Sequence, residues 1–257
     1  VEGEGYFEKR PKLKLHVYTE DEDVKEIFRQ NENFWKDYLT DETLSGELES
    51  KIFVEAYWDE QGYFLMDDLH VLADVRINEG ELRDFEMLYS YKPFIKLKEL
   101  KRIQFTAIQN WLEIENGTIF IPVMFIQSSA VNLTLSGEHT FEQEIDYYFK
   151  INAGQVLADR LKGDAGISDM VPAKRRGFFN LYAHVFGTVE DYNYNTRAKE
   201  VKAHFEATDD QKDRIKQKLI AEFGPIINLD EPVSWKDDIP EYEEEGDPED
   251  PEYLEGF

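Results

Sequence analysis

Alternating apolar and polar residues mark the first part of the chain. In "KLKLHVY", residues 12–18, Leu13, Leu15 and Val17 alternate with polar residues, and "GELESKIFVEAYW", residues 46–58, repeats the pattern. A period of two predicts strands that bury one face. The segment "LHVLADVRINEGEL" alternates again after a turn at residues 59–62, so these last two segments are predicted to form a hairpin.

Three stretches have helical spacing instead. Residues 19–46 begin with acidic cap candidates and predict one or two short helices. Residues 85–100 predict short helices broken near Pro93. Residues 196–223 predict a helical end of the chain, interrupted near "TDD" and stopped by Gly224 and Pro225.

Strands are predicted again between these helices. They are "RIQF", "NWLEIENG", "TIFIPVMFIQSSA", "VNLTLSG", "EIDYYFKI" and "FFNLYAHVFGTV", with turns at Asn116-Gly117 and Ser136-Gly137. "TIFIPVMFI" is apolar on both faces, which is typical of a central strand, and Pro122 inside it predicts a bulge or an edge. The expected fold is mainly β with α: a curved antiparallel sheet with short covering helices and a C-terminal helical segment.

Composition divides the 257 residues into a body, residues 1–228, and an acidic tail, residues 229–257. The tail has 13 Asp and Glu against one Lys and is predicted to be flexible or peripherally docked.

The net charge of -26 argues against binding nucleic acid and against general adhesion to anionic membranes. No Cys is present, which excludes disulfides and thiolate sites. No apolar run is long enough to span a bilayer.

The densest group of possible catalytic or metal-binding side chains is in "SGEHTFEQEID". Two interpretations compete: a hydrolytic or metal site, and the solvent-exposed polar residues of a hairpin. Adjacent residues Glu138 and His139 point apart in the predicted turn, and Glu144 and Asp146 share a solvated strand face. The chain also has no nucleophile motif. We therefore expect no enzyme activity, no catalytic residue, no bound metal and no cofactor.

The order of several motifs resembles the C-terminal region of AsmA-like proteins. The first motif is "INEGELRDFEML", in which a strand ends in a Gly-Glu-Leu turn. Two short helices and a strand pair around Asn-Gly follow it, and the last motif is "SSAVNLTLSGEHTFEQEIDYYFKI". "FFNLYAHVFGTVED" is similar to the strand that precedes the family's terminal segment. The resemblance covers residues 69–224, and the acidic tail lies outside it.

This resemblance implies a periplasmic protein that takes part in phospholipid transfer and outer-membrane biogenesis. Full-length members have an inner-membrane anchor and a long β-sheet folded into a hydrophobic groove. The anchor is expected upstream of this segment, which would be the distal part. The alternative function is a structural or binding module that docks an envelope assembly partner without carrying lipid.

A lipid groove requires a continuous apolar stripe, which alternate positions on successive strands can supply. An ordinary closed core would produce the same alternation, so the pattern leaves both readings open. The candidate groove residues form three rows: Ile119, Ile121, Val123 and Phe125; Val131, Leu133 and Leu135; Ile145, Tyr147 and Phe149.

The only basic cluster is "AKRRG", residues 173–177. Lys174, Arg175 and Arg176 are candidates for contact with a phospholipid headgroup or an acidic partner, since arginine pairs well with phosphate. The alternative is a solvated loop that pairs with the acidic tail.

Overall fold

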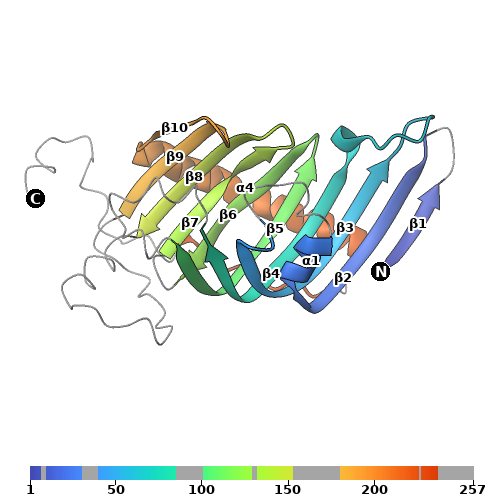
Figure 1. The fold of residues 1–257 in the computed structure, drawn as a ribbon, viewed down its shortest axis with the longest axis horizontal. Coiled ribbons are helices and arrows are strands. Elements are labelled where there is room, and N and C mark those ends of the chain that lie inside the picture. The colour runs from blue at the N-terminus through green and yellow to red at the C-terminus, as the bar shows by residue number, and fades with distance from the viewer. Residues whose placement is uncertain are drawn as a thin grey trace, which may run out of the picture.

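Ten strands form one antiparallel sheet in which each strand pairs with its neighbours in sequence, from β1 to β10. The sheet is open and curved, and the strands lie side by side along the length of the molecule (Figure 1). This is a computed structural model, and it describes residues 1–6, 10–30, 40–84, 101–128, 132–152, 180–225 and 227–236. The expected fold class, a curved antiparallel sheet with helices, is confirmed.

The strands range from four to fourteen residues. They are β1 (Glu2–Tyr6), β2 (Lys12–Asp23), β3 (Leu44–Tyr57), β4 (His70–Arg83), β5 (Arg102–Glu115), β6 (Thr118–Gln127), β7 (Asn132–Thr140), β8 (Glu144–Asn152), β9 (Asn180–Thr188) and β10 (Tyr192–Asn195). The helices of the described residues are α1 (Val24–Gln30), the short 3-10 helix η2 (Met66–Asp68) and α4 (Ala198–Phe223).

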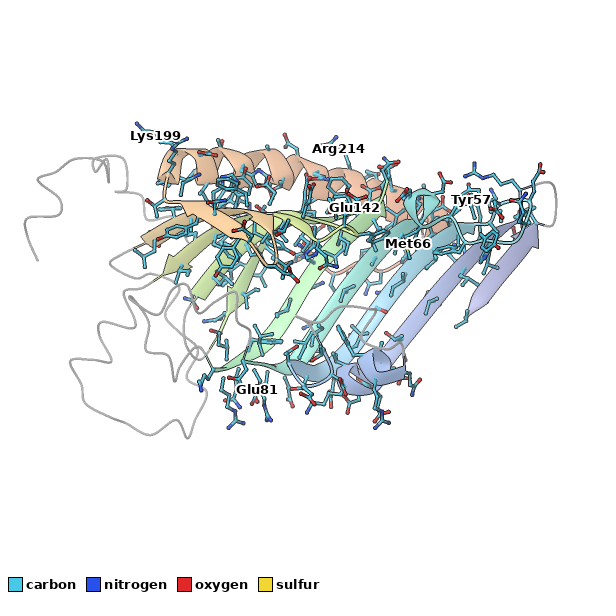
Figure 2. All side chains as sticks on the ribbon, turned by 45° about the horizontal axis from the view of Figure 1, so that its top comes forward. Tyr57, Met66, Glu81, Glu142, Lys199 and Arg214 are labelled. Atoms are coloured by element: carbon cyan, nitrogen blue, oxygen red, sulfur yellow. The ribbon has the colours of Figure 1, made fainter. Side chains whose placement is uncertain are left out.

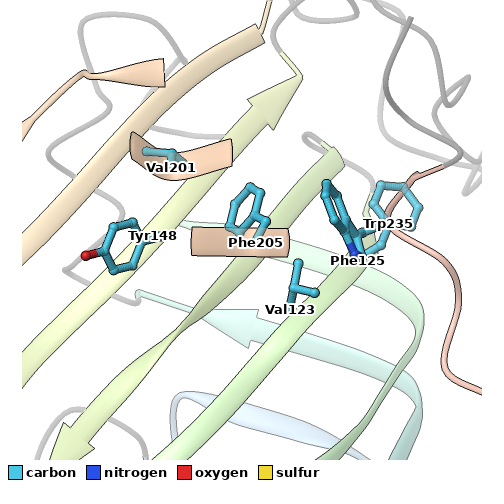
Figure 3. Close-up of a cluster of buried hydrophobic side chains, with 6 residues drawn as sticks. All are labelled: Val123, Phe125, Tyr148, Val201, Phe205 and Trp235. Carbon is cyan, nitrogen blue, oxygen red and sulfur yellow. The ribbon is translucent and has the colours of Figure 1, made fainter. Parts of the chain in front are cut away.

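Helix α4 crosses one face of the sheet and contacts every strand from β3 to β9. In Figure 1 it runs behind the strands. Its buried residues recur at helical spacing, and two apolar clusters form beneath it. In the first, Phe205 and Val201 pack on Val123 and Phe125 of β6 (Figure 3). In the second, Ile215 and Leu219 pack on Phe53, Leu72 and Trp111.

Helix α1 packs on the opposite face of the sheet, in front of the strands in Figure 1. Its Val24 and Phe28 belong to a cluster with apolar residues from four strands, among them Leu48, Ile77 and Ile108. None of the three described helices is both long and apolar enough to cross a membrane.

The helical predictions need two corrections. Residues 19–46 were expected to be helical, but β2 continues to Asp23 and β3 begins at Leu44, so among the described residues only α1 is helical there. The interruption expected near "TDD" does not occur, because the buried face of α4 continues through this stretch, where Phe205, Thr208 and Lys212 are all buried. The helices expected over 85–100 lie outside the described residues.

Two turn predictions have different outcomes. Asn116 and Gly117 both have positive φ, 52° and 70°, and connect β5 to β6 as predicted. Ser136-Gly137 is not a turn: both residues lie inside β7, and the chain turns at residues 141–143. A Cβ on Gly137 would lie 2.3 Å from the Asp146 carbonyl oxygen, so this glycine permits close strand approach.

The Gly-Glu-Leu sequence was likewise expected to end a strand. Instead β4 runs through it to Arg83, with Glu81 opposite Gln104 and Leu82 opposite Ile103. Gly80 is needed for packing, because a Cβ there would lie 2.2 Å from ring atoms of Phe105.

Candidate functional site: the apolar face of the sheet

The face of the sheet opposite α4 is lined almost continuously by apolar side chains. Cross-strand partners in an antiparallel ladder share a face, so the register identifies the residues. Two of the rows are Leu15–Val54–Val71–Ile114 and Val17–Ile52–Ala73–Leu112. Their neighbours along the strands, Phe53 and Leu72, point to the other face and pack against α4.

We call this surface the apolar face. On β2 to β5 it comprises Leu13, Leu15, Val17, Ile52, Val54, Ala56, Val71, Ala73, Val75, Ile77, Ile108, Leu112 and Ile114. On β6 to β9 it comprises Ile119, Ile121, Met124, Ile126, Leu133, Leu135, Ile145, Tyr147, Phe149, Ile151, Leu181, Ala183 and Val185.

The apolar face is covered unevenly. On the β8 side its large side chains are buried, with Ile145 3% exposed and Ile151 2%. On β2 to β5 the larger side chains, such as Leu15, Val54 and Val71, stay partly exposed. Within the described ranges α1 is the only α-helix that packs on this face. The β2 to β5 part is therefore apolar surface that these elements leave partly accessible.

The structure brings together two of the three predicted rows. Leu133 and Leu135 of β7 pack with Ile145, Tyr147 and Phe149 of β8. Ile121 joins the same cluster, and Ile119 lies on the same face, opposite His139. Val131, Lys174, Arg175 and Arg176 lie outside the described residues.

The prediction that Val123 and Phe125 continue the row of Ile119 and Ile121 is wrong. The pairing of β6 with β7 shifts by one residue between Ile121 and Met124, the bulge that Pro122 predicted. Because a one-residue slip moves side chains to the other face, Val123 and Phe125 pack beneath α4, where Figure 3 shows them beside Phe205. Met124 and Ile126 take their places on the apolar face.

A few polar groups interrupt the apolar face. Thr19 and Ser50 are cross-strand partners whose hydroxyl oxygens lie 2.8 Å apart. Asn110 is buried, and its side-chain amide donates to the Pro122 carbonyl at 2.7 Å. Since that carbonyl can only accept, the orientation of the Asn110 amide is fixed. These polar side chains bond within the sheet, so they interrupt the apolar surface little.

The acidic stretch around His139 is divided between the two faces of the sheet. His139 is buried on the apolar face with its Nδ1 3.2 Å from the Tyr147 hydroxyl. Glu138, the next residue back, lies on the other face opposite Asp146, and partial desolvation and that carboxylate raise the pKa of Glu138. Among the described residues, no group of three or more His, Asp or Glu is arranged to hold a metal ion.

Sequence reasoning missed a stack of three rings beneath the first turns of α4. The Tyr148 ring lies parallel to those of His184 and His204, with centroids 4.1 Å and 3.6 Å away. The His184 ring nitrogens contact the carboxylates of Asp146 and Glu200, the latter at 3.1 Å. Three separate elements supply these rings, so no sequence spacing could have signalled them.

The stack affects how two of its members titrate. Burial, together with the nearby carboxylates, raises the pKa of Tyr148 to about 12, so its hydroxyl stays protonated. Burial also lowers the pKa of His204, because it disfavours the charged ring; His184 acts in the same direction and Asp146 opposes it. The Nε2 atom of His204 is buried without a hydrogen-bond partner. The stacked rings and the contact between His184 and Glu200 connect α4 to β8 and β9.

The beginning of the predicted acidic tail is part of the folded body. Trp235 is 3% exposed and packs on Phe205 of α4, with ring centroids 5.6 Å apart (Figure 3). Asp230 lies 3.6 Å from Arg76, and Lys236 lies 2.7 Å from Asp209. The docked segment thus reaches at least residue 236, and residues 237–257 lie outside the described part of the chain.

No protein-family model, curated protein or solved structure significantly matches this chain. The resemblance to AsmA-like proteins consequently stays a prediction.

Proposed function

We propose that this chain is the non-enzymatic C-terminal part of an AsmA-like phospholipid-transfer protein, and that acyl chains lie along its apolar face. The observation that carries the proposal is the run of apolar rows on the face opposite α4, partly accessible from β2 to β5. The opposite face is closed by α4 and mixes charged residues with apolar ones.

The energetics favour an extended hydrocarbon ligand. Each CH₂ group that leaves water contributes roughly 0.8 kcal/mol, and an acyl chain lying on an open surface gains a part of this per group. A row such as Val17–Ile52–Ala73–Leu112 provides contacts across four strands without a charged side chain. A long chain that crosses several strands would therefore accumulate affinity that a compact ligand could not.

The family resemblance supports the remaining parts of the proposal. These are a periplasmic location, a tether to the inner membrane through an anchor elsewhere in the full-length protein, and a role in outer-membrane biogenesis.

Native mass spectrometry of the purified chain tests the proposal, with co-bound phospholipid as the readout. Val54→Asp places a charge in the accessible part of the apolar face and should abolish the lipid adducts. The matched control is Val233→Asp, because Val233 is 44% exposed and lies in the segment that docks beside α4. Adducts should persist in this control.

Circular dichroism and the melting temperature show whether Val54→Asp still folds. If it does not, the nearly isosteric Val54→Thr should fold and reduce the fraction of lipid-bound protein. Absence of lipid from the wild-type chain, after incubation with phospholipid vesicles as well, would refute lipid carriage and favour a module that docks a protein partner on the same face.

A further inference from the structure

Two arginines face each other at the end of the sheet away from α4. Arg83 of β4 and Arg102 of β5 are direct cross-strand partners. Glu81, two residues before Arg83, lies on the same side, near the lower edge of the sheet in Figure 2. Like charges directly opposite each other normally destabilise a strand pair. Another group must therefore offset the repulsion between the two guanidiniums.

Glu81 holds both guanidiniums in place. It is 7% exposed and accepts hydrogen bonds from Nε of Arg83 and, at 2.7 Å, from Nε of Arg102. Gln104 adds a third donor at 3.2 Å. Although burial opposes ionisation, the hydrogen bonds and charges of the two arginines lower the pKa of Glu81, so the carboxylate is charged. Its single negative charge leaves one positive charge on the group of three.

Within the described part of the chain, the outer edges of both guanidiniums are exposed. Each guanidinium has five N–H donors, and the contacts with Glu81 use the Nε edge. The side chains of Arg83 and Arg102 are 51% and 60% exposed, and in the described ranges neither pairs with a second carboxylate. The flanking Lys101 and Asp84, both exposed, cancel in charge. The Nη groups therefore present exposed donors whose Nε edges are held by Glu81.

We propose that Arg83 and Arg102 form a binding site for a phosphate group. Guanidinium donors match phosphate oxygens in pairs, and Glu81 fixes both arginines before any ligand arrives. A phosphate would also neutralise the charge that Glu81 leaves uncompensated. Because the overall charge of -26 repels anions in general, a phosphate would need such paired guanidinium donors to bind here.

The position of the site connects it to the proposed lipid-binding function, on which this part of the inference rests. Leu82 lies between Glu81 and Arg83 in the strand and points to the other side. There it packs in the cluster that contains Ile77 and Ile108 of the apolar face. A phospholipid with its acyl chains on the apolar face could thus place its phosphate at this rim.

Titration calorimetry with three probes tests the site: inorganic phosphate, dihexanoyl phosphatidylglycerol and uncharged dihexanoylglycerol. Arg83→Gln and Arg102→Gln should each weaken phosphate and phosphatidylglycerol binding about tenfold or more. Binding of dihexanoylglycerol should not change. The matched control is Arg29→Gln, which removes an exposed arginine of α1 that pairs with Glu26, and it should bind all three probes like the wild type.

The probes separate this inference from the proposed function. Unchanged affinity for both phosphate probes in the two variants, or no phosphate binding by the wild type, overturns the site, even where dihexanoylglycerol binds. Binding of inorganic phosphate that requires both arginines, without any binding of dihexanoylglycerol, supports the site and rejects lipid carriage. Phosphatidylglycerol that binds no tighter than inorganic phosphate identifies free phosphate as the ligand.

Discussion

Tyr148 connects the titration of a single histidine to the docking of a helix. One side of its ring stacks on His184 of β9, and the other side stacks on His204 of α4. His204 is buried with its Nε2 unbonded, so a proton added there would bring a charge into a site without an acceptor. The stability of α4 on the sheet should therefore depend on pH.

We predict that the protein loses stability as the pH falls below about 6.5, the ordinary pKa of histidine. The pKa of His204 is lowered in the folded state, so the unfolded chain takes up the proton first. The free energy of unfolding therefore decreases as the pH falls, until the pH reaches the pKa of His204 in the folded state. Denaturant unfolding at a series of pH values measures this slope.

The variant His204→Phe isolates the contribution of this one ring. Phenylalanine can keep the stack on Tyr148 but cannot be protonated, so the loss of stability between about pH 7 and pH 5 should become smaller. A variant with the same slope as the wild type would show that other groups cause the acid sensitivity.

At the scale of single elements, alternation predicted the long central strands well because these strands bury at least one face, whereas the mostly exposed β1 and β10 were not predicted. Leu48 to Ala56 and Val71 to Ile77 were placed correctly from a period of two. Periodicity failed where the backbone departs from regular geometry. The bulge at Pro122 was foreseen, but its exact position was not, and that position determines which face Val123 and Phe125 occupy.

The other misses arise from contacts between distant parts of the chain. Gly137 looked like a turn residue, yet it is required where β7 approaches Asp146 and Tyr147 of β8. The composition of residues 229–257 predicted a flexible or peripherally docked tail, and charge counts alone did not show that Trp235 packs against α4 and β6. Neither the packing site nor the close approach exists until the sheet has formed.

Trp235 should stabilise α4 as a unit. We predict that Trp235→Ala lowers the free energy of unfolding by about 3 kcal/mol, since it empties a site formed by Val123, Phe125 and Phe205. Amide hydrogen exchange in the first half of α4 should also become faster than in the wild type. The control Val233→Ala alters a side chain that is 44% exposed in the same segment and should change stability little. Equal effects of both variants would contradict a specific role for Trp235.

At the scale of the whole molecule, the two faces of the sheet differ in what covers them. One face is closed by α4 and residues 227–236, which contribute Phe205, Ile215 and Trp235 to two cores. In the described chain, the other face has α1 near one end of the central strands and partly exposed apolar rows from β2 to β5. A ligand that covers these rows would remove apolar surface from water in the folded state alone, so it should stabilise the fold.

We therefore predict that a short-chain phosphatidylglycerol, kept below its critical micelle concentration, raises the melting temperature. At a concentration 100 times the dissociation constant, linkage gives about 2.7 kcal/mol. In a chain of this size that corresponds to a shift of roughly 5 to 10 °C in the melting temperature.

Val54→Asp should abolish most of the shift, because it disrupts the rows where the acyl chains lie, whereas Val233→Asp should preserve it. Arg83→Gln should reduce the shift for phosphatidylglycerol and not for dihexanoylglycerol. A shift that is the same in all three variants would mean that the lipid stabilises the protein from some other surface.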